Sequence, residues 1–186
     1  MVLLSIIIVL YSCSNDGALM PKRRGYFRID LPEKNYTFYK GDCPFTFEHP
    51  GYSVVLKDRD TNSEPCWLNL VFPKFHGNLY LTYKALEGNL PLFTEECRKF
   101  AVTHEIKASS INEQGVSNDS AHVYGLIYDI EGDAASNLEF YLTDSVHHFI
   151  RGALYFYAVP NKDSLAPVLG FIKQDIYHLI KTFRWE

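Results

Sequence analysis

The chain contains four cysteines, and the first of them, Cys13, lies in a sequence that favours covalent modification. Leu10-Tyr11-Ser12-Cys13 has the form of a lipobox, with an aliphatic residue three positions before the cysteine and a small residue directly before it. The preceding apolar run, 2–11, is about half of the roughly 20 residues that a bilayer-spanning helix needs, which is typical of a signal peptide. We therefore predict a signal peptide at 1–12 and a lipid-modified Cys13. No Lys or Arg precedes the run, and the alternative is a buried N-terminal strand.

The other cysteines, Cys43, Cys66 and Cys97, fall in two kinds of sequence. Cys97 lies on the apolar stripe of a helical pattern, which predicts a buried thiol. Cys43 and Cys66 lie in short stretches rich in Gly, Pro and acidic residues, which indicate loops. Because disulfides form and persist in exported proteins, we predict a bond between Cys43 and Cys66. A metal site is the alternative, but no Cys-x-x-Cys or Cys/His spacing supports it.

Histidine and acidic side chains on expected strands are candidate metal ligands or catalysts. His147 and His148 are adjacent, so on a strand they point to opposite faces and would not share a metal. Asp129 and Glu131 share one face, beside an expected turn, and we predict a solvent-facing strand end. Arg151 has apolar neighbours in sequence, so it needs an anionic partner, and we predict a structural ion pair with Asp129 or Glu131.

No pattern of catalytic residues emerges. Cys97 and His104 would lie two helical turns apart, about 10 Å along the axis, which is too far for a nucleophile and its base. The chain has no Gly-x-Ser-x-Gly, Walker, Gly-x-Gly-x-x-Gly or His-Glu-x-x-His motif. We expect no catalytic residues, no metal and no cofactor. The net charge of −4 also gives no case for nucleic-acid binding.

Three serines each lie between an aspartate and an apolar residue, which is a signal for O-glycosylation of exported proteins. They are Ser120, Ser145 and Ser164. Asp-Ser is also ordinary turn and capping chemistry, and this alternative stays open.

The rest of the chain supplies the elements that would position these residues. Residues 13–24 read as a polar tether, and 25–186 as one globular domain. Alternation and apolar runs predict strands at 25–31, 36–39, 45–48, 52–56, 67–72, 78–84, 122–131, 137–143 and 148–159. A period of three to four residues predicts helices at 90–107, with Asn89 as N-cap, and at 165–183, capped by Asp163 or Ser164. Between them, 108–120 reads as a polar connection with a small strand at 111–114.

This order predicts an α+β fold, in which two amphipathic helices pack on a single, mainly antiparallel sheet. The arrangement is similar to that of the Mog1/PsbP-like folds, which also end in a long helix. That similarity is an analogy of fold and says nothing about function.

Several segments together carry a resemblance to a known family. They are 24–32 (RGYFRIDLP), 65–69 (PCWLN), 111–114 (INEQ), 128–132 (YDIEG), 151–156 (RGALYF) and 160–167 (PNKDSLAP). In number and order they closely resemble the gliding-motility lipoprotein GldD family of Bacteroidota. The resemblance implies an envelope lipoprotein that is required for gliding and linked to type IX secretion. The family carries no established catalytic residues, so it implies none here.

We therefore expect a non-enzymatic interaction domain, anchored by lipid to the outer or inner membrane and facing the periplasm. Its expected partners are the membrane and other gliding and secretion proteins of the envelope. The alternative is a small-ligand or glycan binder that uses exposed aromatic residues such as Trp67, Tyr80 or Tyr124. A third possibility is a hydrolase without a sequence signature.

Overall fold

The computed structural model describes residues 29–157 and 162–186, with the side chains of 162–164 left aside. The expected signal peptide, Cys13 and the tether lie outside these residues. Within the described part of the chain, no helix is long and apolar enough to span a bilayer.

The strands form two antiparallel sheets, so the expectation of a single sheet was wrong. The small sheet has the order β1-β2-β10, and the large sheet has the order β3-β4-β5-β9-β8-β7-β6. The strands are β1 (Tyr36–Lys40), β2 (Phe45–Pro50), β3 (Val54–Lys57), β4 (Leu68–Phe72), β5 (Gly77–Ala85), β6 (Ala108–Asn118), β7 (Val123–Gly132), β8 (Ser136–Thr143), β9 (His148–Phe156) and β10 (Arg184–Trp185). The small sheet exists because the last residues of the chain pair with β2, and such a distant pairing leaves no local pattern.

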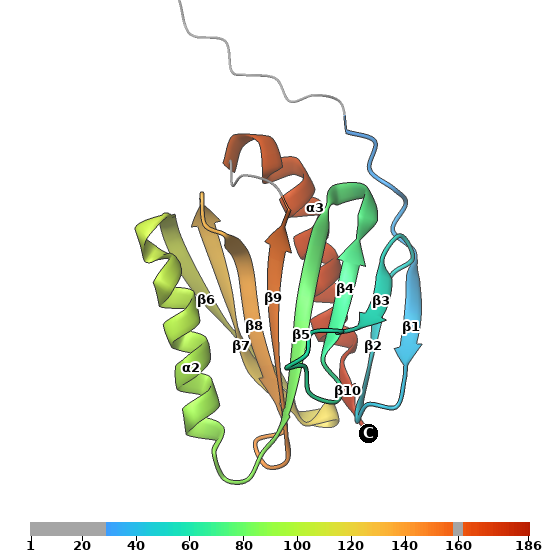
Figure 1. Ribbon diagram of the computed structural model, residues 1–186, viewed down its shortest axis with the longest axis vertical. Helices are drawn as coiled ribbons and strands as arrows, with labels where there is room; N and C mark the ends of the chain where they lie inside the picture. The colour runs from blue at the N-terminus through green and yellow to red at the C-terminus, as the bar shows by residue number, and fades with distance from the viewer. Residues whose placement is uncertain (1–28, 158–161) are drawn as a thin grey trace, which may run out of the picture.

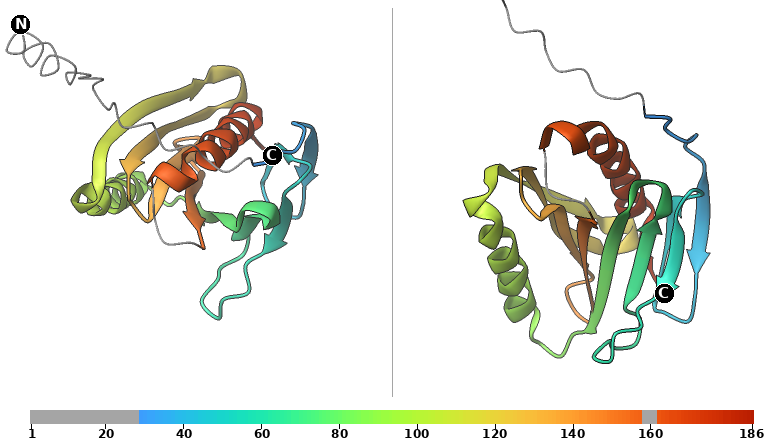
Figure 2. Two further views of the ribbon diagram at one scale, coloured as in Figure 1. Left: turned by 90° about the horizontal axis from the view of Figure 1, so that it is seen from above. Right: turned by 45° about the horizontal axis from the view of Figure 1, so that its top comes forward.

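Two α-helices cover opposite faces of the large sheet. Helix α2 (Leu90–Thr103) runs into the 3₁₀ turn η2 (His104–Ile106), and α3 is Lys162–Thr182. Two further 3₁₀ turns, η1 (Pro73–Phe75) and η3 (Asp119–Ala121), connect strands. Figure 1 shows α2 beside β6, β7 and β8, while α3 lies behind the centre of the sheet. The view from above shows the large sheet curling around α3, with the small sheet on the other side of the helix (Figure 2).

Each helix buries an apolar stripe against its side of the sheet. Ile172, Ile176 and Leu179 of α3 are fully buried in the main core, which includes Phe45 and Phe47 of β2. A smaller core lies under α2 and is made by Cys97, Ala101, Tyr128, Ile130 and Phe149, among others. Full burial of a Phe, Leu or Ile side chain stabilises the fold by about 1.5–3 kcal/mol. The two clusters therefore explain why both helices hold their places.

Most expected elements are present, but five details differ. Helix α3 begins at Lys162 rather than at 165, so the expected caps Asp163 and Ser164 lie inside it. Residues 29–31 are not a strand, and the rest of 25–31 lies outside the described residues. The expected polar connection 108–120 contains an 11-residue strand, β6. Its polar composition conceals it because, at the end of a sheet, neither face needs to be apolar throughout. Strand β9 ends at Phe156 rather than at 159. Asn89 precedes α2 without capping it, since its Oδ1 accepts a bond from the Glu87 amide (3.0 Å) instead.

Candidate functional site

The free edge of β6 is the longest exposed strand edge among the described residues. Strand β6 ends the order of the large sheet and pairs only with β7 there. A register shift between Ala108 and Ser110 disturbs its start, and the regular pairing runs from Ser110 to Asn118. Residues 112–115 are all exposed. An edge of this kind presents unpaired N–H and C=O groups to any extended chain that approaches.

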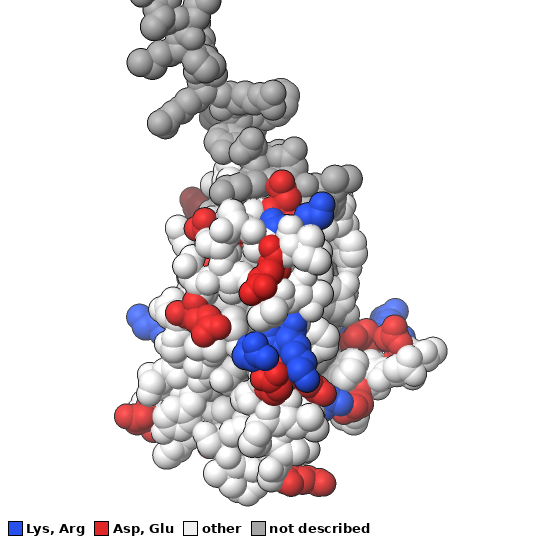
Figure 3. Space-filling view, turned by 90° about the vertical axis from the view of Figure 1, so that its left-hand side faces the viewer, with Lys and Arg blue, Asp and Glu red and all other residues white. Residues whose placement is uncertain are grey.

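The residues of β6 do little to block such pairing. Natural sheet edges are commonly protected by Lys, Pro or a strong twist, whereas Glu113 is the only charged residue in β6 and the strand contains no proline. Figure 3 looks onto the side of the molecule that carries α2 and shows charges of both signs dispersed over a largely uncharged surface. The neighbourhood of the edge therefore has no single-sign field that would repel an approaching polypeptide.

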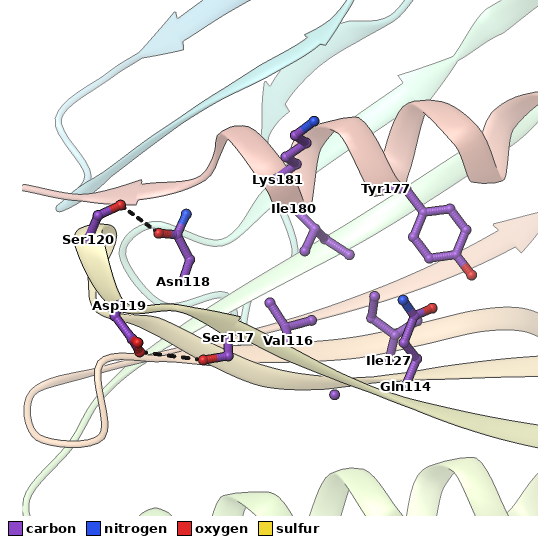
Figure 4. A pocket seen from close by; sticks show the side chains of 11 residues that line it. Gln114, Val116, Ser117, Asn118, Asp119, Ser120, Ile127, Tyr177, Ile180 and Lys181 are labelled. Carbon is purple, nitrogen blue, oxygen red and sulfur yellow. Dashed lines mark hydrogen bonds between the residues drawn. The ribbon is translucent and has the colours of Figure 1, made fainter.

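An open groove of about 750 Å³ runs beside this edge, between β6 and the C-terminal half of α3. We call it the β6–α3 groove. Its apolar part is formed by Val116 on β6, Ile127 on β7 and Ile180 on α3. Figure 4 shows Val116 and Ile180 facing one another across the groove, with Gln114 below Tyr177.

Hydrogen bonds fix the polar rim of the groove. The Ser120 hydroxyl donates to Asn118 Oδ1 (2.8 Å), which also accepts from the Ala121 amide (3.3 Å) and so caps η3 (Figure 4). The Ser117 hydroxyl donates to Asp119 Oδ1 at 3.5 Å, a weaker contact. The rim is thus set by the turn between β6 and β7.

The opposite wall is attached to the sheet through Asp129. Its carboxylate accepts a hydrogen bond from the Tyr177 hydroxyl (3.2 Å) and pairs with Lys173, both on α3. Burial, and then the Asp129 charge, raise the pKa of Tyr177 to about 12, so the hydroxyl keeps its proton at neutral pH. The expectation that Asp129 faces solvent was therefore wrong. Only Glu131 is exposed as expected.

Arg151 does form an ion pair, but with a residue that the sequence did not suggest. Its NH2 donates to Glu139 Oε2 (2.9 Å), and His104 Nε2 lies 3.1 Å from Glu139 Oε1. Glu139 is on β8, the strand next to β9, whereas Asp129 and Glu131 are one strand further away on β7. Strand order cannot be read from the sequence, so the nearer carboxylate could not be identified.

Cys97 and His104 do not form a catalytic pair. Cys97 is 4% exposed, and burial raises the pKa of its thiol to about 12, which leaves it protonated and unreactive at neutral pH. His104 contacts Glu139 instead. Phe100, on the same helix as Cys97, is 49% exposed, and its ring centroid lies 4.3 Å from the Arg151 guanidinium carbon.

The adjacent histidines, His147 and His148, contact different neighbours. His148 Nδ1 lies 2.8 Å from the Tyr83 hydroxyl, and His147 contacts Asp144 at 3.6 Å. In the part of the chain that the structure describes, no three His, Cys, Asp or Glu side chains come together as metal ligands would.

Three of the predicted modifications fall on described residues: the disulfide and the glycans on Ser120 and Ser145. A disulfide joins Cys43 and Cys66, whose Cα atoms are 5.5 Å apart. Ser120 and Ser145 are both exposed, at the turns after β6 and β8. The side chain of Ser164 and the whole of Cys13 lie outside the described residues.

The three aromatic residues proposed as ligand contacts do not form one site. The Trp67 indole donates to the Tyr83 carbonyl (3.0 Å), and Tyr80 lines a groove beside β3, β4 and β5. Tyr124 lies on β7, where its hydroxyl contacts Asp119. The β6 edge itself was missed, although the lack of Lys and Pro across 108–118 was visible in the sequence.

Comparison with known proteins identifies the family. None of the curated proteins matches the chain. Among solved structures, the solution structure of cyanobacterial PsbP (CyanoP) from Synechocystis sp. PCC 6803 has a TM-score of 0.49 and 9% identity, covering 86% of this chain and 98% of that one. A family model described as gliding motility lipoprotein GldD matches residues 16–185. Because the match covers nearly all of the sequence and the whole described fold, the chain belongs to the GldD family of gliding motility lipoproteins.

Proposed function

We propose that this chain is an envelope lipoprotein that faces the periplasm and works in gliding motility together with type IX secretion. In this proposal residues 1–12 are removed, lipid on Cys13 anchors the chain, 13–24 form a tether, and 25–186 bind another envelope protein without catalysing a reaction. The family match supports the lipoprotein and gliding parts of this proposal.

The observation that carries the binding role is the free β6 edge. Its main-chain groups are complemented best by another extended chain, which would add to the sheet as a further strand. Backbone pairing gives such a complex affinity, and side-chain pockets beside the edge give it specificity. The β6–α3 groove lies where those side chains would project, with Val116 and Ile180 available for an apolar residue.

The proposal that the domain catalyses no reaction rests on the contacts and burial of its reactive side chains. The carboxylate of Glu139 is occupied by Arg151 and His104, and the Cys97 thiol is buried and protonated. Each of these groups contributes to packing of α2 rather than facing one of the grooves. This arrangement favours a binding module over the hydrolase alternative.

A pair of glycine substitutions tests the role of the edge. A Cβ added at Gly115 on β6, or at Gly170 on α3, would meet no heavy atom within 4 Å, so both sites accept a side chain. Gly115→Lys places on the edge the residue that natural proteins use to prevent strand pairing. We expect it to abolish cell spreading and reduce secretion of type IX cargo, with normal protein level and thermal unfolding. Gly170→Lys, the matched control, should retain both activities.

Normal spreading of the Gly115→Lys strain would contradict the proposal. A photo-crosslinker at Gln114 provides a second measurement: the wild-type chain should be joined to another envelope protein, and the Gly115→Lys chain should not. Crosslinking only to a second copy would show that the edge serves self-association instead.

Mass spectrometry of the purified chain tests its processing. We expect a mature N-terminus at Cys13 carrying acyl chains, since two or three such chains hold a protein stably on a membrane. An unmodified Cys13 would overturn the anchor. The same spectra report the proposed glycans on Ser120, Ser145 and Ser164, whose peptides should carry added hexose mass.

A further inference from the structure

A second groove, separate from the β6 edge, lies against β3, β4 and β5 on the face of the large sheet opposite α3. It has a volume of about 550 Å³, within the range of roughly 300–1,000 Å³ that is usual for small-molecule sites. Leu56, Asn69 and Tyr80 lie directly opposite one another across the three strands and all line it. We call it the β4–β5 groove. Helix α2 lies beside β6, β7 and β8 and leaves β3, β4 and β5 uncovered (Figure 1).

Two amides of this groove have unused hydrogen-bonding capacity. Asn78 is 3% exposed, and Asn69 is half-buried. The side-chain oxygen of each is inaccessible and, among the described residues, has no hydrogen-bond partner. Buried polar atoms are nearly always paired, so each amide would gain a hydrogen bond if its side chain turned toward a donor in the groove.

A pair of tyrosine hydroxyls provides further donors and acceptors beside the amides. The hydroxyls of Tyr80 and Tyr157 are 2.8 Å apart, and Asn78 also hydrogen-bonds to the Tyr157 hydroxyl. One hydroxyl of the pair donates to the other, so one O–H hydrogen is left to bind elsewhere. Tyr157 is 69% exposed, which places this hydroxyl pair within reach of a ligand from solvent.

The charges that line the groove cancel. The segment 57–60 contributes two positive charges, on Lys57 and Arg59, and two negative charges, on Asp58 and Asp60. An anionic or cationic ligand would therefore gain no net attraction. Amide oxygens seeking O–H donors, tyrosine hydroxyls and aromatic rings instead match a neutral molecule with many hydroxyl groups and an apolar ring face. We propose that the β4–β5 groove binds a neutral oligosaccharide.

This inference goes beyond the proposed function, since it concerns another face and another class of ligand. An envelope component that binds both a polypeptide and a glycan would connect a protein assembly to a surface or cell-wall polymer. The two proposals fail independently, because Gly115→Lys leaves the β4–β5 groove intact.

Saturation-transfer NMR on the purified full-length chain in detergent tests the proposal. The probes are tetrasaccharides of glucose, mannose, galactose and N-acetylglucosamine, with a sulfated heparin tetrasaccharide as the anionic comparison. We expect at least one neutral tetrasaccharide to bind and the sulfated one not to bind. Tyr80→Phe and Tyr157→Phe each remove one hydroxyl and should weaken binding about fivefold to tenfold.

Tyr124→Phe is the matched control, because it removes a tyrosine hydroxyl from β7, outside the groove. It should leave sugar binding unchanged. The proposal fails if no neutral tetrasaccharide binds, if the sulfated probe binds more tightly, or if the Tyr80 and Tyr157 variants bind as well as the control. Urea denaturation of each variant distinguishes a lost contact from a lost fold.

Discussion

Asp175, near the middle of α3, shows how a single residue can hold distant parts of this chain together. Its side chain is fully buried, yet it accepts hydrogen bonds from Lys34 Nζ (2.7 Å), the Tyr36 hydroxyl (2.8 Å) and the Tyr52 hydroxyl. A buried carboxylate is tolerated only when it is paired and hydrogen-bonded in this way. The contact therefore ties the segment before β1 and the turn after β2 to α3.

Because of the same contact, the stability of the fold should change with pH in the alkaline range. Burial, and then the bond to Asp175, raise the pKa of Tyr36 to about 12, and the pKa of Tyr52 is raised further. Between pH 10 and 12 the unfolded chain releases protons that the native chain retains. The free energy of unfolding should therefore fall as pH rises through this range, as measured by urea denaturation.

Asp175→Asn provides the control for this dependence. It removes the charge that opposes ionisation of Tyr36 and Tyr52, so the fall should become shallower, although burial alone keeps part of it. A free energy of unfolding that stays constant from pH 10 to 12 would contradict the assignment. Tyrosinate absorbance of the native protein, followed over the same range, reports the titration directly.

At the scale of elements, α2 is held to the sheet by the buried Glu139–Arg151–His104 contact. Replacing Glu139 by Ala would leave the Arg151 guanidinium without its carboxylate. Loss of one partner of a buried ion pair costs several kcal/mol, and because Arg151 is partly accessible we expect about 2–4 kcal/mol. Chemical denaturation measures this loss, and hydrogen exchange should rise more in α2 than in α3.

A double variant separates charge burial from simple loss of packing. Glu139→Leu with Arg151→Met removes both charges and should recover much of the stability, because apolar replacement of a buried pair is often neutral. The control is Arg98→Ala, which breaks the exposed Arg98–Glu95 surface pair of the same helix and should leave stability nearly unchanged. If Glu139→Ala behaved like this control, the contact would not hold α2.

The elements also show what the sequence could predict. Both helices were expected because their apolar residues recur every three or four positions, and β7, β8 and β9 because short turns separate them. Strand β6 was largely missed, since an edge strand needs little apolar alternation. An ion pair of Arg151 with a carboxylate was predicted correctly, but the predicted partners were on β7. The actual partner depends on strand order, which the sequence does not show.

At the scale of the whole molecule, the Cys43–Cys66 disulfide connects the two sheets. Cys43 precedes β2 of the small sheet and Cys66 precedes β4 of the large one, with a sequence separation of 23. Closing a loop of this length stabilises a fold by about 3 kcal/mol. Replacing both cysteines by Ser should lower the free energy of unfolding by that amount, and hydrogen exchange should rise more in β1 and β2 than in β8.

Thiol titration checks the same disulfide in the wild-type chain. The native protein should show no reactive thiol, because Cys97 is buried. After denaturation without reductant, a chain acylated at Cys13 should show only the Cys97 thiol. Two further thiols would mean that Cys43 and Cys66 are not joined.

The two-sheet architecture could not be predicted from the sequence, because it depends on pairing between residues far apart in the chain. Phe45 of β2 pairs with Trp185, and Thr46 pairs with Arg184, across almost the whole domain. The local sequence around either segment does not indicate that the two segments pair. The candidate β4–β5 groove is similar: Tyr80 was suspected from its residue type, but its proximity to Tyr157 and Asn78 depends on the register of β5.

The Asp175 contact would have a mechanical consequence under the proposed anchor at Cys13, which would hold the domain by its N-terminal end. A pull on the segment before residue 29 reaches Lys34 and Tyr36 first, and through Asp175 it passes to α3 in the centre of the fold (Figure 1). The hydrogen bonds between β1 and β2 lie perpendicular to the strands, so tension along β1 shears them together rather than opening them one by one. With the proposed anchor, these contacts would resist unravelling of the domain from its N-terminal end.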